Sequence, residues 1–482
     1  MSDPPAAARR TSVAWRAAWR DAWREPTFGA LLFIVALVPR LWVALAWSGE
    51  AVWDGHYYDF GAKRIAAGLG YSDDRTIAGA LVWHPWCHYP VGYSAFLAFF
   101  YRWLGPARGV AAVADALTGA AIAVVTWLLA RYAVSEWRAR AAGLVVALHP
   151  GLVLYAALVM SEPLAALLTL AAFWLTVRDR DERRGIVVGS LVLGVSALVR
   201  PQALLCAPFL GALGLGAEKR GWRARAVGAA AACALALVPV LPWTARNCRV
   251  MDGCALVSTN AGWNLAIGAF PRATGRFETL RSSDGCRNVT GQVQQDRCWL
   301  QYGLAQIEAH PWHWLSLVPA KLGYTFDHES FAVEYLHEAR PEAWPEVTRE
   351  NARGATTLAH RLLLAAAALG CVAFPASRDP RRTARAATQG ALLALAAVLG
   401  ALAFASSSPA FWPLAIFAAA VPWIPFAGRP AASPALLLGV SLLATTEAAH
   451  AVFFGEDRYH VVATPVLALL AAAALRRPRT EA

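Results

Sequence analysis

The stretch that decides the fold is the apolar run FGALLFIVALVPRLWVALAW, which covers residues 28–47 and contains one charged residue, Arg40. An apolar helix of about 20 residues is long enough to cross the hydrocarbon core of a bilayer. Similar runs recur along the 482-residue chain, for example at 227–243 and 391–405. Hydrophobic residues make up 57% of the sequence, charged residues 16%, and the mean hydropathy is +0.41. This composition predicts an all-α polytopic membrane protein and excludes a soluble globular domain.

The distribution of positive charge predicts the orientation. A few short segments hold 24 of the 44 Lys and Arg residues but only 6 of the 32 acids: 9–24, 131–140, 178–184, 219–225, 378–385, Arg429 and 476–479. Such segments are expected on the cytoplasmic side of a cell (inner or plasma) membrane. The net charge of +12 is therefore interpreted as membrane topology, and no nucleic acid is expected as a partner.

Placing every basic segment inside predicts about twelve transmembrane helices, within a range of eleven to thirteen, with both termini cytoplasmic. The apolar stretch 91–104 is too short to cross and is expected to be a re-entrant or interfacial helix. The predicted spans are 28–47, 109–130, 141–155, 162–177, 186–199, 203–217, 226–244, 356–375, 386–405, 410–427, 435–454 and 461–475. Polar residues precede the first run and no cleavage site follows it, so we expect it to remain in the protein and not to act as a signal peptide.

These spans divide the chain into modules with two large external loops. The predicted parts are a basic cytoplasmic tail (1–27), an N-terminal transmembrane module (28–244) with a catalytic external loop (48–108), a large external loop with interfacial helices (245–355), a C-terminal transmembrane module (356–475) and a short cytoplasmic tail (476–482). Both loops are rich in Trp, Tyr and His, which suit the headgroup boundary as plain anchors or as parts of a site.

The first external loop presents an acid close to the membrane surface. The run Trp53-Asp54-Gly55-His56-Tyr57-Tyr58-Asp59 follows shortly after the first span and leads into a predicted short helix. Asp54 suits two roles, because Asp is a preferred N-cap residue and because a carboxylate can act as a general base. The two roles are compatible with each other.

Several motifs in one order carry a resemblance to a known family. The run 54–71, followed by His88-Tyr89-Pro90-Val91-Gly92-Tyr93, resembles the first external loop of glycosyltransferase family 39, which includes the protein O-mannosyltransferases and is similar to the lipid A aminoarabinose transferases. Further agreement lies at Ser161-Glu162-Pro163, Val199-Arg200-Pro201, 242–247, 258–265, His310-Pro311 with Lys321, and Arg458-Tyr459. The likeness covers nearly the whole chain, without the soluble C-terminal domain of many relatives.

The resemblance implies a C-type glycosyltransferase fold and an inverting transfer of one sugar from a polyprenyl-phosphate donor to an extracytoplasmic acceptor. By similarity, Asp54 is the general base for the acceptor hydroxyl. The leaving lipid phosphate needs cations, and four basic residues fall at external span ends or in the large loop: Arg200, Arg246, Lys321 and Arg458. Snorkelling of these side chains to the headgroups is the alternative for each of them.

Other polar residues of the motifs are expected to line the substrate cavity. Glu162 begins a span and is interpreted as a second catalytic acid, or as an acid favoured by the helix dipole. The cavity is expected to include Tyr57, Tyr58, Asp59, His88, Tyr459 and His460, and its far wall is expected to include Glu447 and His450.

Two charges in the first two spans are expected to pair. Arg40 and Asp115 each lie about 10 Å deep at about 1.5 Å per helical residue. An unpartnered charge at that depth costs on the order of 3 kcal/mol on insertion scales. We therefore expect a structural Arg40–Asp115 ion pair that supports the catalytic loop.

The cysteines and acids bear on disulfides and metals. Cys248 with Cys254 and Cys286 with Cys298 are close enough in sequence to be bridged in an oxidising compartment. No Cys/His spacing resembles a zinc site. Asp54, Asp59 and Glu162 could hold a divalent cation, but the family pattern does not require one, and no cofactor is expected.

Two other classes of function remain open from the sequence. A lipid or sugar transporter, or a flippase, would also use many spans and buried charges, although it predicts charges near the midplane. A non-catalytic subunit of a surface-polysaccharide assembly is the second alternative. The sugar and the acceptor, whether protein, lipid or glycan of the cell envelope, are not specified by the sequence.

Overall fold

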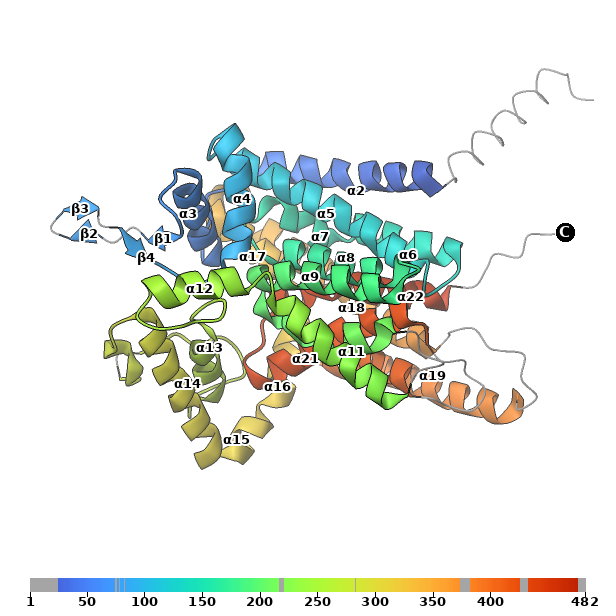
Figure 1. Ribbon diagram of the computed structural model, residues 1–482. Helices are drawn as coiled ribbons and strands as arrows, with labels where there is room; N and C mark the ends of the chain where they lie inside the picture. The colour runs from blue at the N-terminus through green and yellow to red at the C-terminus, as the bar shows by residue number, and fades with distance from the viewer. Residues whose placement is uncertain are drawn as a thin grey trace, which may run out of the picture.

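The computed structural model describes residues 25–73, 76–77, 79–81, 83–215, 221–281, 283–372, 382–424 and 432–475. The described chain is mostly helical, which confirms the predicted fold class in its broad form. Long apolar helices lie side by side in a bundle, and a group of shorter elements lies beyond one end of it (Figure 1). The terminal tails, except for residues 25–27, fall outside the described residues, as do parts of the basic segments at 219–225, 378–385 and 429.

The N-terminal part of the bundle is built from helices that pack against their neighbours in sequence. Its elements are α2 (Glu25–Trp47), α5 (Arg108–Ala130), α6 (Glu136–Leu148), α7 (Pro150–Leu154), η1 (Tyr155–Ala157), α8 (Glu162–Arg178), α9 (Glu182–Val199), η2 (Pro201–Cys206), α10 (Ala207–Gly214), α11 (Trp222–Leu237) and α12 (Leu241–Val250).

The C-terminal part of the bundle packs against the N-terminal part through α22, which contacts α6 and α5. Its elements are α18 (Glu346–Val372), α19 (Arg382–Ala405), α20 (Trp412–Ala420), η5 (Val421–Trp423), α21 (Pro434–Val452), η6 (Asp457–Val462) and α22 (Thr464–Ala474). The described start of α2 and the end of α22 lie at the same end of the bundle, opposite the shorter elements (Figure 1).

The shorter elements come from the two predicted external loops. The first loop forms α3 (Asp54–Ala66), α4 (Val91–Leu104) and four two-residue strands, with β1 (Ser72–Asp73) antiparallel to β4 (His84–Pro85) and β2 (Thr76–Ile77) antiparallel to β3 (Ala80–Leu81). The second forms α13 (Ala261–Ala269), η3 (Cys286–Asn288), α14 (Gln292–Ala309), α15 (Pro311–Ser316), α16 (Val318–Phe326), α17 (Phe331–Ala339) and η4 (Pro341–Ala343).

The described part of each predicted span falls on one helix or on two or three consecutive elements, but not all of these are long enough to cross a membrane by length and composition alone. The ends of three predicted spans, 216–217, 373–375 and 425–427, lie outside the described residues. Among the described residues five helices pass that test, or seven if two bent pairs each count as one span. Three further apolar stretches are shorter, at 201–214, 412–423 and 464–474. The number twelve therefore stays a prediction. Residues 91–104 form one helix with the predicted bounds, packed against α3, α5 and α9.

The predicted Arg40–Asp115 ion pair is wrong, because Arg40 donates instead to backbone carbonyls at a break between two helices. The chain bends by 53° between α6 and α7, where Pro150 has no N–H to give to the carbonyl of Val146. Arg40 donates to Val146 O at 2.9 Å and to Ala147 O at 2.6 Å, and it passes α5 against Gly119. In a membrane those carbonyls need a partner inside the protein.

Asp115 has a different partner from the predicted one. Its Oδ2 accepts a hydrogen bond of 2.7 Å from the hydroxyl of Tyr93 on α4. The support for the first external loop therefore comes from a Tyr93–Asp115 bond between α4 and α5.

We expect Arg40→Met and Asp115→Asn each to destabilise the protein, and their effects to add within about 0.5 kcal/mol, because they serve separate contacts. Each carbonyl freed by Arg40→Met should cost about 1–3 kcal/mol. Reversible unfolding in mixed detergent measures the double-mutant cycle. Arg138→Met is the control, since the half-buried Arg138 also donates to a carbonyl, Leu475 O, at 3.0 Å, in a hydrogen bond that is exposed. A coupling energy well above 0.5 kcal/mol would instead support a direct Arg40–Asp115 ion pair.

Both cysteine pairs expected from the sequence are bridged. Cys248–Cys254 closes the turn after α12, and Cys286–Cys298 ties η3 to α14. The disulfides therefore brace the segment that was predicted to form the second external loop.

Candidate active site

The first residue of α3 is Asp54, and its carboxylate faces away from the helix backbone. The residue before it, Trp53, has φ 50°, a left-handed conformation that no other described non-glycine residue adopts. No side chain caps α3, so the capping role for Asp54 is not seen. Gly55 allows close packing here, because a Cβ at that position would lie 2.3 Å from the hydroxyl of Tyr335 on α17.

Two side chains from distant parts of the chain hold the Asp54 carboxylate. Tyr89 donates its hydroxyl to Oδ1 at 2.6 Å, and Arg458 donates Nη1 to Oδ2 at 2.5 Å. Arg458 belongs to η6, so the predicted general base meets a predicted phosphate ligand from the other end of the sequence.

Arg458 also contacts two other acids. Its Nε lies 2.5 Å from Glu456 Oε2 and 4.0 Å from Glu162 Oε1. Its guanidinium stacks over the rings of Phe331 and Tyr459, at 5.1 and 5.0 Å from their centroids. These contacts fix the plane of a guanidinium that is 12% exposed.

A second arginine lies beside the first. Arg200, which follows α9, places Nη1 2.6 Å from Glu162 Oε1 and 3.2 Å from Ser161 Oγ. The hydroxyl of Tyr58 lies 3.2 Å from the same Ser161 Oγ. Glu162, the first residue of α8, is fully buried and therefore depends on these cations.

Burial and charge act in opposite directions on the two acids outside the spans. Burial disfavours the charged form of Asp54, but the charge of Arg458 and the Tyr89 hydrogen bond outweigh it, so the pKa of Asp54 is lowered. At Glu456 burial dominates over the attraction of Arg458, with Asp457, Asp54 and Glu162 adding repulsion, and the pKa is raised to about 7. Asp54 is thus ionised at neutral pH, whereas Glu456 titrates there.

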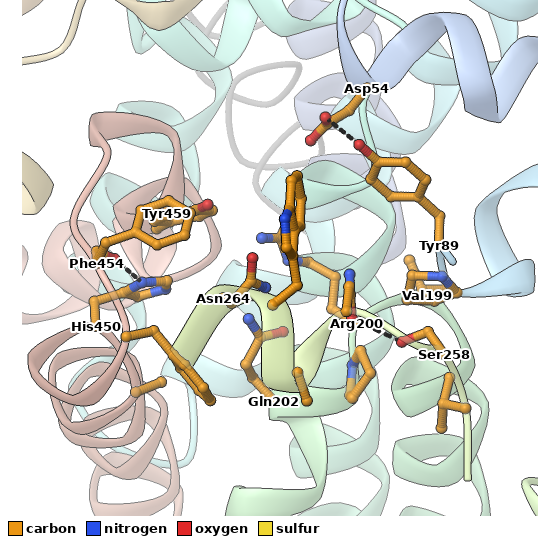
Figure 2. A pocket seen from close by; sticks show the side chains of 18 of the residues that line it. Asp54, Tyr89, Val199, Arg200, Gln202, Ser258, Asn264, His450, Phe454 and Tyr459 are labelled. Atoms are coloured by element: carbon orange, nitrogen blue, oxygen red, sulfur yellow. Dashed lines mark hydrogen bonds between the residues drawn. The ribbon is translucent and has the colours of Figure 1, made fainter. Parts of the chain in front are cut away.

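A cavity of about 750 Å³ is bordered by Asp54, Tyr89, Arg200 and Arg458. The acids Glu162 and Glu456 contact these arginines but do not line the cavity. Asp54 and Tyr89 lie on one side of it, His450 and Tyr459 on the other, and Arg200, Gln202 and Asn264 between them (Figure 2). The walls also carry amide and aromatic side chains from the second external loop, among them Asn260, Trp263 and Phe277. The lining also includes exposed aliphatic residues, among them Leu205, Leu256 and Val452. The cavity therefore joins a charged end to an apolar mouth.

Six of the predicted residues line this cavity: Asp54, Tyr57, Tyr58, Arg200, Arg458 and Tyr459. Glu162 does not line it but pairs with Arg200, which does. His450, predicted for the far wall, lines it as well and stacks on Tyr459 with ring centroids 4.0 Å apart. Glu447 does not line it.

Five other predicted residues lie outside the cavity lining. Asp59 faces the other side of α3, where it accepts from Tyr101 at 2.5 Å and pairs with Lys63 at 2.6 Å. His88 packs behind the wall against Trp263.

The remaining three, Arg246, Lys321 and His460, hydrogen-bond to backbone carbonyls. Arg246 donates to Trp86 O and Tyr71 O, so it fixes the base of the strand pair. Lys321 donates to Val452 O at 3.1 Å, and His460 donates Nδ1 to Thr325 O at 2.7 Å. Two of the four predicted phosphate ligands, Arg200 and Arg458, thus reach the cavity, and Arg246 and Lys321 do not.

Some residues of the site had no role assigned from the sequence. Glu456 does not line the cavity but pairs with Arg458, and its position two residues before the Arg458-Tyr459 motif was the available signal. Asn264 lies within the motif at 258–265, and Gln202 directly follows Val199-Arg200-Pro201. Nothing in a single sequence distinguishes an amide that faces a cavity from one that faces solvent.

We expect an anionic ligand of the cavity to bind more weakly above pH 7. Below that pH Glu456 is protonated, and as the pH passes its pKa of about 7 the new carboxylate competes with the ligand for Arg458. Binding titrations with a phosphodiester, whose own charge is constant from pH 5.5 to 8.5, check this, with Glu456→Gln expected to abolish the weakening. An unchanged weakening in that variant would assign the titration to another group.

Comparison with known proteins gives structural neighbours only. No family model and no curated protein matches the chain. The chain is similar to the Archaeoglobus fulgidus oligosaccharyltransferase tethered with an acceptor peptide containing the NVT sequon (TM-score 0.45, 14% identity, 94% of this chain and 50% of that one). It is also similar to ArnT from Cupriavidus metallidurans bound to undecaprenyl phosphate (TM-score 0.36, 15% identity, 94% and 78%). The chain thus spans about half the length of the oligosaccharyltransferase.

Proposed function

We propose that this protein is a membrane-embedded inverting glycosyltransferase that moves a single hexose or pentose from a polyprenyl-phosphate donor to an extracytoplasmic acceptor. The observation that carries the proposal is the meeting of Asp54, Arg200 and Arg458 at the charged end of a cavity whose mouth is apolar. A polyprenyl-phosphate sugar has groups that match this order: an apolar chain for the mouth, and an anionic phosphate and a polar sugar ring for the charged end.

The donor phosphate is proposed to bind Arg458 and Arg200. Guanidinium groups bind phosphate oxygens in a bidentate manner, and they stabilise the negative charge that grows on the phosphate as the glycosidic bond breaks. Both arginines already neutralise acids, so the phosphate must compete with Asp54 and Glu456 for Arg458. The raised pKa of Glu456 makes that competition easier at neutral pH.

Donor binding is proposed to activate the base. In the structure Arg458 holds the Asp54 carboxylate and lowers its pKa, which makes it a weak base. When the phosphate takes over Arg458, Asp54 loses its strongest cation and becomes more basic. The acceptor hydroxyl then transfers its proton to Asp54 as its oxygen attacks the anomeric carbon from the face opposite the phosphate.

The rest of the cavity suits a sugar ring. Tyr57 and Trp263 offer aromatic faces, and Gln202, Asn260 and Asn264 offer amide donors and acceptors for hydroxyl groups. Exposed Leu205, Leu256 and Val452 at the mouth are proposed to contact the polyprenyl chain.

Gene deletion and complementation test the proposal. Mass spectrometry of the surface glycans, glycolipids and glycoproteins is expected to show one product that lacks a single sugar in the deletion strain. The wild-type gene should restore that sugar, and Asp54→Asn, expressed at the same level, should not. Full restoration by Asp54→Asn would favour a scaffold or a flippase.

A further inference from the structure

A buried group of three side chains lies behind the cavity, where three segments far apart in the sequence meet. Glu329 lies between α16 and α17, His360 lies on α18 and His460 lies on η6. All three are at most 3% exposed, and their nearest ligand atoms lie within 4.8 Å of one another. Glu329 Oε2 is 3.8 Å from His360 Nδ1 and 3.6 Å from His460 Nε2.

Hydrogen bonds fix which nitrogens of the two imidazoles face the carboxylate as lone pairs. His360 donates Nε2 to Phe326 O at 2.9 Å, and His460 donates Nδ1 to Thr325 O at 2.7 Å. A carbonyl can only accept, so those nitrogens carry the protons, and in neutral rings the opposite nitrogens are acceptors. Two acceptor nitrogens therefore point at a carboxylate that also only accepts.

None of these inward-facing atoms has a hydrogen-bond partner among the described residues. This holds for His360 Nδ1, for His460 Nε2 and for both oxygens of Glu329. Buried acceptors that face one another without a donor are costly, so a cation or an added proton is required between them.

A third histidine faces the same carboxylate from outside the group, but it is too far away to donate a hydrogen bond to it. His149 accepts from Leu152 N at 3.5 Å through Nδ1, so its Nε2 carries a proton and lies 3.8 Å from Glu329 Oε2. Gly151 leaves room for the same carboxylate, because a Cβ there would lie 1.4 Å from Oε1. The backbone at the start of α7 thus packs directly against the Glu329 carboxylate.

We propose that Glu329, His360 and His460 bind a divalent transition-metal ion, Zn²⁺ by the chemistry of its ligands. Two imidazole nitrogens and one carboxylate oxygen are a ligand set that Zn²⁺ favours, with a water as fourth ligand. Bonds of about 2.0–2.2 Å in a tetrahedron place ligand atoms about 3.3–3.6 Å apart. The observed separations of 3.6 and 3.8 Å are close to that spacing.

The ion has a structural role. None of its three ligands lines the substrate cavity. The site joins α18 and the segment before α17 to η6, two residues after Arg458 in the chain. Metal binding therefore fixes the position of the segment that carries the guanidinium next to Asp54. The inference does not depend on the proposed transferase activity.

Metal content and cobalt spectroscopy of the full chain in nanodiscs test the site. Protein purified without chelators is expected to contain about one zinc per chain. After chelator treatment, Co²⁺ should bind with the visible absorption of a tetrahedral site. Glu329→Gln and His460→Gln should each weaken Co²⁺ binding at least about tenfold. His337→Gln is the matched control, since that histidine is also bonded to a carbonyl, Trp344 O at 3.0 Å, but lies outside the group.

Zinc X-ray absorption on the wild-type protein decides the question even if the ligand variants do not fold. Two imidazoles and oxygen scatterers are expected. The proposal is overturned if the wild-type protein neither contains zinc nor gives a Co²⁺ spectrum, in which case an added proton holds the group together. It is also overturned if sulfur scatterers appear, or if the folded Glu329→Gln and His460→Gln variants keep wild-type affinity.

Discussion

Asp54→Asn is expected to lower the transfer rate by about 10²–10⁴-fold, the usual contribution of a general base. The amide has the shape of the carboxylate and can still accept from Tyr89, but it cannot take a proton from the acceptor. Arg458 keeps Glu456 as a partner, so the fold of the site should survive. Release of polyprenyl phosphate from labelled donors extracted from native membranes measures the rate.

The Michaelis constant for the donor should move in the opposite direction. Removing the Asp54 charge frees Arg458 for the phosphate. The Michaelis constant for the donor is therefore expected to be unchanged or lower, while kcat falls. A scaffold role predicts no change in either constant. A variant that keeps more than half of the wild-type kcat would exclude Asp54 as the base.

Asp59→Asn is the matched control for this experiment. Asp59 lies on the same helix and is also held by a tyrosine and a cation, Tyr101 and Lys63, but it lies outside the cavity. We expect a rate close to that of the wild type. Any general effect of losing one acid from α3 would appear in both variants and could be subtracted.

The positions of the apolar helices could be predicted because the hydropathy of a segment depends only on its own residues. The stretch 28–47 lies in α2, and the apolar run 91–104 has the helix bounds that its length suggested. The bend at Pro150 was equally visible as a proline, but its consequence was not. The freed carbonyls of Val146 and Ala147 are partners for Arg40 only once α2 and α6 are known to pack together.

Within the site, the sequence predicted motifs better than the orientation of their members. Asp54 and Asp59 were both placed in the cavity, yet five residues along an α-helix turn the side chain by about 140°. Helical periodicity alone separates them, as the structure shows. Glu329, His360 and His460 could not be grouped from the sequence, because their meeting depends on the packing of α18 against the segments on either side of it.

Arg458→Gln is expected to reduce kcat about 100- to 1,000-fold, the typical loss when one donor to a developing negative charge is removed. Gln is neutral, so it cannot offer two phosphate oxygens a positively charged partner. Unlike Asp54→Asn, this change should also raise the Michaelis constant for the donor, because the cation binds phosphate in the ground state as well as in the transition state. The two variants thus differ in the direction of the binding effect.

The single variant leaves the half-buried acids Asp54 and Glu456 without their shared cation. Breaking a fully buried pair can cost about 3–5 kcal/mol, and a smaller loss is expected for these partly exposed acids. The double variant Arg458→Gln/Glu456→Gln removes one of the two orphaned acids and is expected to recover stability. It should not recover kcat, because no cation remains at that position beside the leaving phosphate. Arg349→Gln is the control for losing an arginine that pairs with two acids, since Arg349 holds Glu334 and Glu346 at the surface. If the stable double variant transfers sugar at the wild-type rate, Arg458 is a structural partner of Asp54, and the phosphate binds Arg200 alone.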